Sequence, residues 1–282
     1  MKKVAVIQDL SSFGKCSLTA AIPVLSVMGV QACPLPTAVL SAQTGYPSYF
    51  WEDFTSKMNQ FTEEWNKLEV TFDGIFTGFV TGGEQINNIF HFLDTFYKEE
   101  TRLLVDPVMG DDGEVYDIFS DGLLERMKDL VKQADVITPN VTECCLLSGL
   151  SFEKLQNYSS AEDYMKALEE TGKHLRQATG AEVIITGVNP PALPGDKQSI
   201  GNLYIDKNNA FYQGMEYNGK SYSGTGDLFA SVIMGSMMRG ENLKDAVQLA
   251  VKFLTEAIHD SSVESVPEIE GINFEKYLGM LL

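Results

Sequence analysis

The chain alternates short apolar segments with longer segments whose apolar residues recur every three or four positions. Strand-like segments lie at 4–7, 32–35, 73–76, 103–105, 136–138, 183–186, 202–205 and 210–213. Helix-like segments lie at 17–28, 84–97, 161–177, 227–238, 243–259 and 274–281. Because strands and helices alternate, the pattern predicts a mostly parallel central sheet with helices on both faces.

The segment 84–97 shows the helical period clearly. Its apolar residues on one face are Ile86, Ile89, Phe90, Leu93 and Phe96. We find no internal repeat, low-complexity tract or linker, and 282 residues are within reach of one α/β domain. A single domain over 1–282 is therefore expected.

Unusual residues gather where the predicted strands end. These positions are Asp9, Gly78, Asp106, Asn140 and Thr186. In open α/β sheets, ligands bind at the carboxyl ends of the strands. The pattern therefore predicts a ligand site at this edge of the sheet.

The net charge of −18 limits the partners that the protein can have. A strongly acidic surface repels nucleic acids and anionic membranes, so neither is an expected partner. The same field opposes an anionic substrate such as ATP. A nucleotide site here needs local help from Mg²⁺, backbone N–H groups or a few cationic side chains.

The cysteines and histidines give no sign of a metal or a catalytic triad. Cys16, Cys33, Cys144 and Cys145 form no C-x-x-C pair, and each is expected to be a buried, reduced thiol. His91, His174 and His259 all fall within predicted helices, and structural or surface roles are expected for them. The first apolar run is too short for a signal peptide and no segment suits a membrane span, which predicts a cytoplasmic protein.

The segment Gly224-Thr225-Gly226-Asp227 precedes a predicted helix. Two glycines allow a tight turn that presents backbone N–H groups to phosphate oxygens at a helix N-terminus. An ordinary glycine turn with Asp227 as a helix cap fits the same letters. Taken alone, the motif leaves both interpretations open.

Two further motifs supply carboxylates. Asp106 to Asp111 follows an apolar strand and could organise Mg²⁺, or it could be a turn set by its proline. Asn140 and Glu143 lie one helical turn apart and could face one ligand or its hydrated metal. They could equally form a capping box, and both roles are compatible.

These three motifs, in this order, resemble the ribokinase superfamily and within it the pyridoxal kinases. The match runs from about residue 4 to residue 258. The segment 40–46, Leu-Ser-Ala-Gln-Thr-Gly-Tyr, resembles the family's Phe-Ser-Asn-His-Thr-Gly-Tyr substrate loop. Thr77-Gly78-Phe79 resembles its Thr-Gly-Tyr segment, and 111–116 falls where the family has a flexible flap. A helix near residue 17 leaves no room for the small β lid of ribokinases proper.

The resemblance implies a ribokinase-like three-layer fold without a separate lid domain, and a role for each matching residue. Asp227 would be the catalytic base, with Gly224, Thr225 and Gly226 forming the anion hole. The residues implied on the substrate side are Asp9, Gln43, Thr44, Phe79 and Tyr116. Those implied near ATP and Mg²⁺ are Asp106, Asp111, Thr138, Asn140, Glu143 and Thr186, with Asp106 and Glu143 acting on the metal directly or through water.

The implied function is ATP-dependent phosphorylation of the 5′-hydroxymethyl group of pyridoxal, pyridoxine or pyridoxamine by a homodimer. A monovalent-cation requirement stays open. The family's serine, histidine and tyrosine are replaced here by Asp9, Gln43 and Phe79. The resemblance therefore predicts phosphoryl transfer more firmly than it predicts which substrate ring is bound. The alternatives are a hydroxymethylpyrimidine kinase and a nucleotide-binding protein without catalysis. We expect the pKa of Asp227 to be near normal, and an aspartate with such a pKa can still serve as the base.

Overall fold

The computed structural model describes residues 1–116, 122–192, 195 and 197–282. Within these residues, one nine-stranded sheet has the order β11-β10-β9-β8-β5-β4-β1-β2-β3. The strands are β1 (Lys3–Ser11), β2 (Gln31–Leu40), β3 (Trp51–Asp53), β4 (Gly74–Thr77), β5 (Arg102–Val105), β8 (Val136–Ile137), β9 (Glu182–Val188), β10 (Ser199–Ile205) and β11 (Ala210–Glu216). The six central strands, β9-β8-β5-β4-β1-β2, are all parallel to their neighbours in this row. The outer strands β3, β10 and β11 pair antiparallel. The predicted mostly parallel sheet is confirmed.

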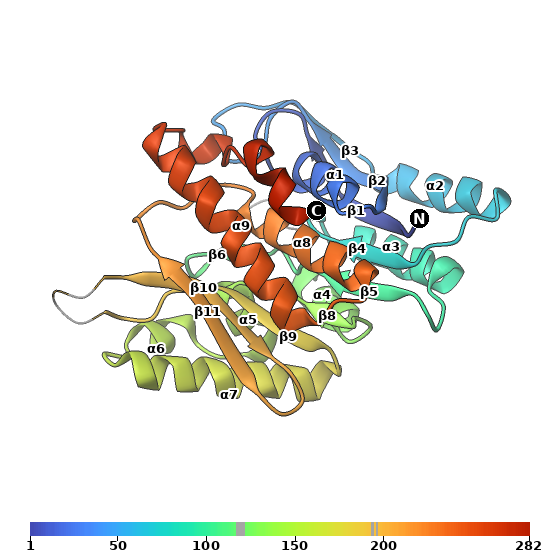
Figure 1. Ribbon diagram of the computed structural model, residues 1–282. Helices are drawn as coiled ribbons and strands as arrows, with labels where there is room; N and C mark the ends of the chain where they lie inside the picture. Colours follow the sequence, from blue (N-terminus) through green and yellow to red (C-terminus); the bar gives the residue numbers. More distant parts are fainter. Residues whose placement is uncertain (117–121, 193–194, 196) are drawn as a thin grey trace.

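Helices cover both faces of this sheet (Figure 1). One face packs against α1 (Ser17–Val27), α8 (Thr225–Arg239) and α9 (Leu243–Val263). The other packs against α2 (Thr55–Lys67), α3 (Gly83–Phe96), α4 (Leu123–Val131), α5 (Val141–Ser148), α6 (Phe152–Gln156) and α7 (Ala161–Thr179). The described chain therefore has the three-layer ribokinase-like arrangement. None of its helices is long and apolar enough to span a membrane.

The central strands are buried on both sides. In β1, Ala5 and Ile7 belong to one apolar cluster, while Val4 and Val6 belong to the cluster on the opposite face. Side chains alternate across a strand, so a strand with helices on both faces needs an unbroken apolar run. This explains why the predicted strands appear in the sequence as continuous apolar segments.

Some elements were not predicted from the sequence. Helix α2 was missed although Met58, Phe61 and Trp65 recur at helical spacing and pack against the core, because most of the residues between them are polar. Strand β3 is a three-residue edge strand, and α4 was also missed. The predicted final helix is a 3₁₀ helix, η2 (Glu275–Leu281), preceded by the short 3₁₀ turn η1 (Glu268–Glu270).

The topology brings distant residues to one edge of the sheet. Strands β1, β4, β5 and β8 run parallel, so their carboxyl ends meet there. A further parallel bridge joins Asn140, just beyond β8, to Thr186 in β9. A small hairpin, β6 (Gly110–Asp111) and β7 (Glu114–Val115), leaves the sheet directly after β5. This edge carries the predicted ligand site.

The packing predicts a large cost for truncating Phe92. This side chain is 1% exposed and its ring centroid lies 4.7 Å from that of Phe96 and 5.7 Å from that of Phe72. Phe92→Ala should lower the free energy of unfolding by about 3–5 kcal/mol in urea denaturation, because it leaves a cavity. Phe50→Ala is the matched control: Phe50 is 66% exposed, and its loss should cost no more than about 0.5 kcal/mol. Equal costs for the two variants would contradict this packing.

Candidate active site

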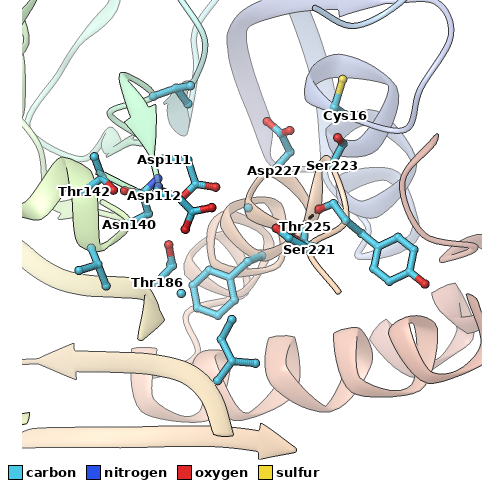
Figure 2. Close-up of a pocket in the computed structure, with 18 of the residues that line it drawn as sticks. Cys16, Asp111, Asp112, Asn140, Thr142, Thr186, Ser221, Ser223, Thr225 and Asp227 are labelled. Atoms are coloured by element: carbon cyan, nitrogen blue, oxygen red, sulfur yellow. Dashed lines mark hydrogen bonds between the residues drawn. The ribbon is translucent and has the colours of Figure 1, made fainter. Parts of the chain in front are cut away.

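A cavity of about 860 Å³ lies at the carboxyl edge of the sheet. Every residue to which the resemblance gave a role lines it, whereas Gly78 at the end of β4 does not. The residues with an implied role are Asp9, Gln43, Thr44, Phe79, Asp106, Asp111, Tyr116, Thr138, Asn140, Glu143, Thr186, Gly224, Thr225, Gly226 and Asp227. Figure 2 shows two groups on the two sides of this space, with Asp111, Asp112, Asn140 and Thr186 on one side and Asp227, Thr225 and Ser221 on the other.

The glycine turn before α8 requires its first glycine. Gly224 has φ +79°, and a Cβ added there would lie 1.9 Å from the carbonyl oxygen of Lys15. The turn is closed by Thr225 Oγ1, which donates to the carbonyl oxygen of Tyr222 at 3.0 Å. The first N–H groups of a helix have no partner within it, and the helix dipole favours anions at that end. This turn can therefore hold a phosphoryl group.

Asp227 lies in the first turn of α8 but does not cap it. The capping position is Gly224, and no side-chain hydrogen bond caps the helix. The Asp227 residue is half-buried, and it lines the cavity instead. The simple capping interpretation of this aspartate is therefore wrong, and its carboxyl is available for chemistry.

The surroundings of Asp227 raise its pKa to about 8, chiefly because the carboxyl is withdrawn from water. The charges of Asp106 and Asp9 raise the pKa further, while a hydrogen bond from the Ser17 backbone N–H lowers it. The expected near-normal pKa is therefore wrong for the ligand-free protein. A group whose pKa lies near neutrality is well matched to accepting a proton at physiological pH.

Asn140 and Glu143 form the capping box that the sequence left open. The Glu143 N–H donates to Asn140 Oδ1 at 2.8 Å, and Glu143 Oε2 accepts from the Asn140 N–H at 2.8 Å. Glu143 Oε1 also accepts from the Met109 N–H at 3.0 Å, just past the end of β5. The capping role is confirmed, and the same bonds hold the buried Glu143 carboxyl at the cavity wall.

Asp106 and Glu143 form a pair of buried carboxyls. Asp106 Oδ1 accepts from Thr138 Oγ1 at 2.8 Å. Burial raises the pKa of Asp106 to about 6, and burial together with the Asp106 charge raises the pKa of Glu143 well above its ordinary value. In the described part of the chain, no three Asp, Glu, His or Cys side chains converge as a metal site. A cation here would therefore need further ligands, such as water or phosphate oxygens.

The β6–β7 hairpin is fastened to α5 by two hydrogen bonds. Asn140 Nδ2 donates to the carbonyl oxygen of Gly110 at 2.7 Å, and the Gly113 N–H donates to Thr142 Oγ1 at 2.9 Å. The hairpin brings Asp111 to the cavity, and Tyr116 follows directly after it. The segment expected to form a flap thus lies over the site, tied by its tip and its base.

Gln43 joins the loop after β2 to the glycine turn. Its Nε2 donates to the carbonyl oxygen of Ile269 at 3.0 Å and to Ser223 Oγ at 3.3 Å, and its Oε1 accepts from the Gly45 N–H at 2.7 Å. The side-chain amide is thus engaged within the protein. Asp9 faces the cavity nearby: it is 4% exposed, and its Oδ2 accepts from Ser11 Oγ at 2.7 Å.

Several cavity residues were missed from the sequence, and Ser17, Cys16 and Lys220 are three of them. Ser17 has φ +48°, an uncommon conformation for a non-glycine residue, and its N–H faces Asp227. Cys16 and Lys220 also line the cavity. The sequence signal that could have found them is position: Cys16 and Ser17 lie shortly after β1, and Lys220 lies shortly before the glycine motif.

The expectations for cysteine and histidine are largely confirmed. All four thiols are free, but Cys33 is only half-buried because it lies on a partly exposed stretch of β2. The three histidines lie on α3, α7 and α9 with exposed side chains. Among the described residues that line the cavity there is no histidine.

A glycine turn suited to phosphate and buried carboxyls at the carboxyl edge of a mostly parallel sheet are typical of a small-molecule kinase of the ribokinase-like fold. Residues 12–268 match the family model of phosphomethylpyrimidine kinase. A pyridoxal kinase from Dictyostelium discoideum is 28% identical, with 94% of this chain and 89% of the relative covered. The chain therefore belongs to the phosphomethylpyrimidine kinase family, and it is an ATP-dependent small-molecule kinase.

Two solved structures support this assignment. The crystal structure of pyridoxal kinase from Lactobacillus plantarum has a TM-score of 0.86 and 30% identity, covering 100% of this chain and 97% of that one. A candidate phosphomethylpyrimidine kinase from Bacteroides thetaiotaomicron, solved with pyridoxal, has a TM-score of 0.87 and 38% identity. The match covers 99% of this chain and 95% of that one. Both likenesses extend over nearly the whole chain.

The raised pKa of Asp227 predicts a pH-dependent stability. Because its folded pKa of about 8 lies above the ordinary 3.8, the ionised carboxyl costs stability, and this cost grows as the pH rises from near 4 to near 8. Asp227→Asn should therefore stabilise the ligand-free protein near pH 8 and have little effect near pH 4, as measured by urea unfolding. Asp112→Asn, at an exposed carboxylate of the same cavity, is the control. A stabilisation by Asp227→Asn that is the same at both pH values would contradict the assignment.

Proposed function

We propose that the protein transfers the γ-phosphoryl group of ATP to the 5′-hydroxymethyl group of pyridoxal, pyridoxine or pyridoxamine. The observation that carries this proposal is the first turn of α8, where a phosphate-binding turn and an uncapped, cavity-facing carboxyl share four consecutive residues, 224–227. The pyridoxal present in the related Bacteroides structure supports a B6 substrate. A single kinase domain, a cytoplasmic location and a homodimer remain predictions of the sequence.

In the proposed reaction, Asp227 is the general base. The substrate lies between Asp227 and the wall formed by Asp9, Thr44 and Phe79, with its hydroxyl toward the Asp227 carboxylate. The alcohol oxygen forms a bond to the γ-phosphorus as the bond to the ADP oxygen breaks, and the alcohol proton passes to Asp227. The transition state is loose, so positioning and charge stabilisation by the 224–226 N–H groups do most of the work.

The carboxyls of Asp106 and Glu143 fit a role in holding Mg²⁺. They are buried, provide hard oxygen donors, and repel each other as long as no cation lies near. The bonds that Glu143 makes to backbone N–H groups favour contact through water. When bound with ATP, Mg²⁺ would neutralise phosphate charge. Asp111, Thr138, Asn140 and Thr186 complete the proposed ATP side, with the Asn140 amide acting by holding Gly110 and Glu143.

A hydroxymethylpyrimidine kinase is the second candidate, because the matching family model describes phosphomethylpyrimidine kinases. Related dual-specificity enzymes can carry Gly-Thr-Gly-Cys where this chain has Gly-Thr-Gly-Asp, which favours the B6 substrates. ATP consumption with pyridoxal, pyridoxine, pyridoxamine and hydroxymethylpyrimidine separates the two. Preferred phosphorylation of the B6 compounds supports the proposal. Reaction with hydroxymethylpyrimidine alone would keep the Asp227 mechanism and overturn the substrate.

Replacing the proposed base should abolish turnover and spare nucleotide binding. Asp227→Ala should lower kcat at least about a hundredfold, because general-base catalysis typically contributes ~10²–10⁴. ATP should still bind, as measured by calorimetry without the alcohol. Asp129→Ala, at a carboxylate on α4 outside the cavity, should leave kcat unchanged. Near-normal turnover by Asp227→Ala would remove Asp227 from the mechanism.

The hairpin anchors should control the coupling of ATP use to alcohol phosphorylation. Thr142→Val keeps the side-chain shape but removes the hydroxyl that accepts from the Gly113 N–H. With its tip released, the hairpin should admit water more often, raising ATP hydrolysis in the absence of an alcohol. The measurement is phosphate released with and without pyridoxal. Thr171→Val, which alters a threonine on α7, is the control. An unchanged ratio in Thr142→Val would show that the tip bond does not exclude water.

A further inference from the structure

The charges around the cavity leave an anionic nucleotide with little help from side chains. Seven acidic residues line it: Asp9, Asp106, Asp111, Asp112, Glu143, Glu216 and Asp227. Among the described lining residues, Lys220 is the one with a cationic side chain. A lone cation in a negative cavity has a large effect on where a polyphosphate can lie.

Lys220 is held by the loop that also forms the phosphate-binding turn. This loop joins β11 to α8, and Lys220 lies four positions before Gly224. Its backbone N–H donates to Asn218 Oδ1 at 3.0 Å, which fixes the bend of the loop. The turn and the lysine therefore belong to one short segment of the chain.

The Lys220 ammonium is also positioned by an aromatic ring. Its Nζ lies 5.9 Å from the centroid of the Tyr222 ring, within the range of a cation–π contact. Tyr222 is 4% exposed, and its carbonyl oxygen accepts from Thr225 Oγ1 at 3.0 Å. Within the described chain, the ammonium makes no ion pair. It is thus placed near the turn with its charge not taken up by a carboxylate.

The neighbouring cavity wall suits the rest of a nucleotide. Met215 on β11 and Leu254 and Ile258 on α9 line it with apolar surface, which suits a planar base. The loop from β11 to Gly224 thus runs from apolar lining to phosphate-binding turn. Lys220 lies between the two along the chain, at a position that fits the phosphates of a nucleotide lying between them.

We propose that Lys220 is a nucleotide-binding residue whose ammonium contacts the polyphosphate of ATP. This inference rests on the proposed placement of ATP in the cavity but does not depend on which alcohol is phosphorylated. The lysine adds the side-chain cation that the acidic cavity otherwise lacks, and the backbone N–H groups of the turn bind the transferring group.

The test compares Lys220→Met with the wild-type protein by calorimetric binding of ATP and of adenosine, without an alcohol. Methionine keeps an unbranched apolar stem over Tyr222 and removes the charge. We expect the Kd for ATP to rise about tenfold, the size of one charge-assisted hydrogen bond, and the Kd for adenosine to stay the same. Added salt should weaken ATP binding more in the wild type than in the variant. Lys220→Arg should retain most of the affinity.

Lys207→Met is the matched control. Lys207 lies exposed in the turn between β10 and β11, outside the cavity, and its loss changes the net charge equally. ATP binding by Lys220→Met equal to that of the control would overturn the inference. Equal weakening of ATP and adenosine would also overturn it, because Lys220 would then shape the loop rather than contact phosphate. Either result leaves the kinase assignment intact, whereas a wild-type protein that binds no ATP would overturn both.

Discussion

The structure depends on holding several carboxyls together out of water at one edge of a parallel sheet. Asp9, Asp106 and Glu143 are almost completely buried, and Asp227 faces the same cavity. Each of these groups has a raised pKa, chiefly because burial disfavours the charged form. Such an arrangement is unfavourable by itself. The apolar clusters on the two faces of the sheet stabilise the fold and offset the cost of burying these carboxyls.

Local hydrogen bonds decide how these carboxyls can act. The capping box and the Met109 N–H together engage both oxygens of Glu143, so this carboxyl is fixed in place. Asp227 makes no cap and sits on a turn that only a glycine at 224 can form. Asp227 is thus a carboxyl that no capping bond engages, and it lies beside the N–H groups of the glycine turn. This difference in partners, rather than residue type, separates the roles of the acidic groups.

The substrate loop and the phosphate-binding turn are mechanically joined. Gln43 bonds to Ser223, next to Gly224, and to Ile269 in the C-terminal segment. Glu268 bonds the same turn from the other side, accepting from the N–H groups of Ser221 and Ser223. The loop after β2 and the glycine turn are therefore connected through few bonds.

Much of the fold and the chemistry could be read from the sequence. The alternating apolar segments determined the parallel sheet and its helices, because burial on both faces demands continuous apolar strands. The motifs at 106–111, 140–143 and 224–227 indicated the class of reaction through their resemblance, in this order, to the ribokinase superfamily, whereas each motif alone left a structural role open. Strand β3 escaped because a three-residue edge strand buries too little to leave a pattern. Helix α2 does bury Met58 and packs Phe61 and Trp65 against the core, but the polar residues between them hid this helical spacing.

Only the tertiary structure decided how the site residues act on one another. The pKa of Asp227 depends on Asp106 and Asp9, which lie more than a hundred positions away in the chain. The placement of Lys220 beside the turn, the Ser17 N–H that faces Asp227, and the use of the Gln43 amide follow from packing between distant segments. Burial and the distances between charges set these properties, and neither is a property of any single stretch of sequence.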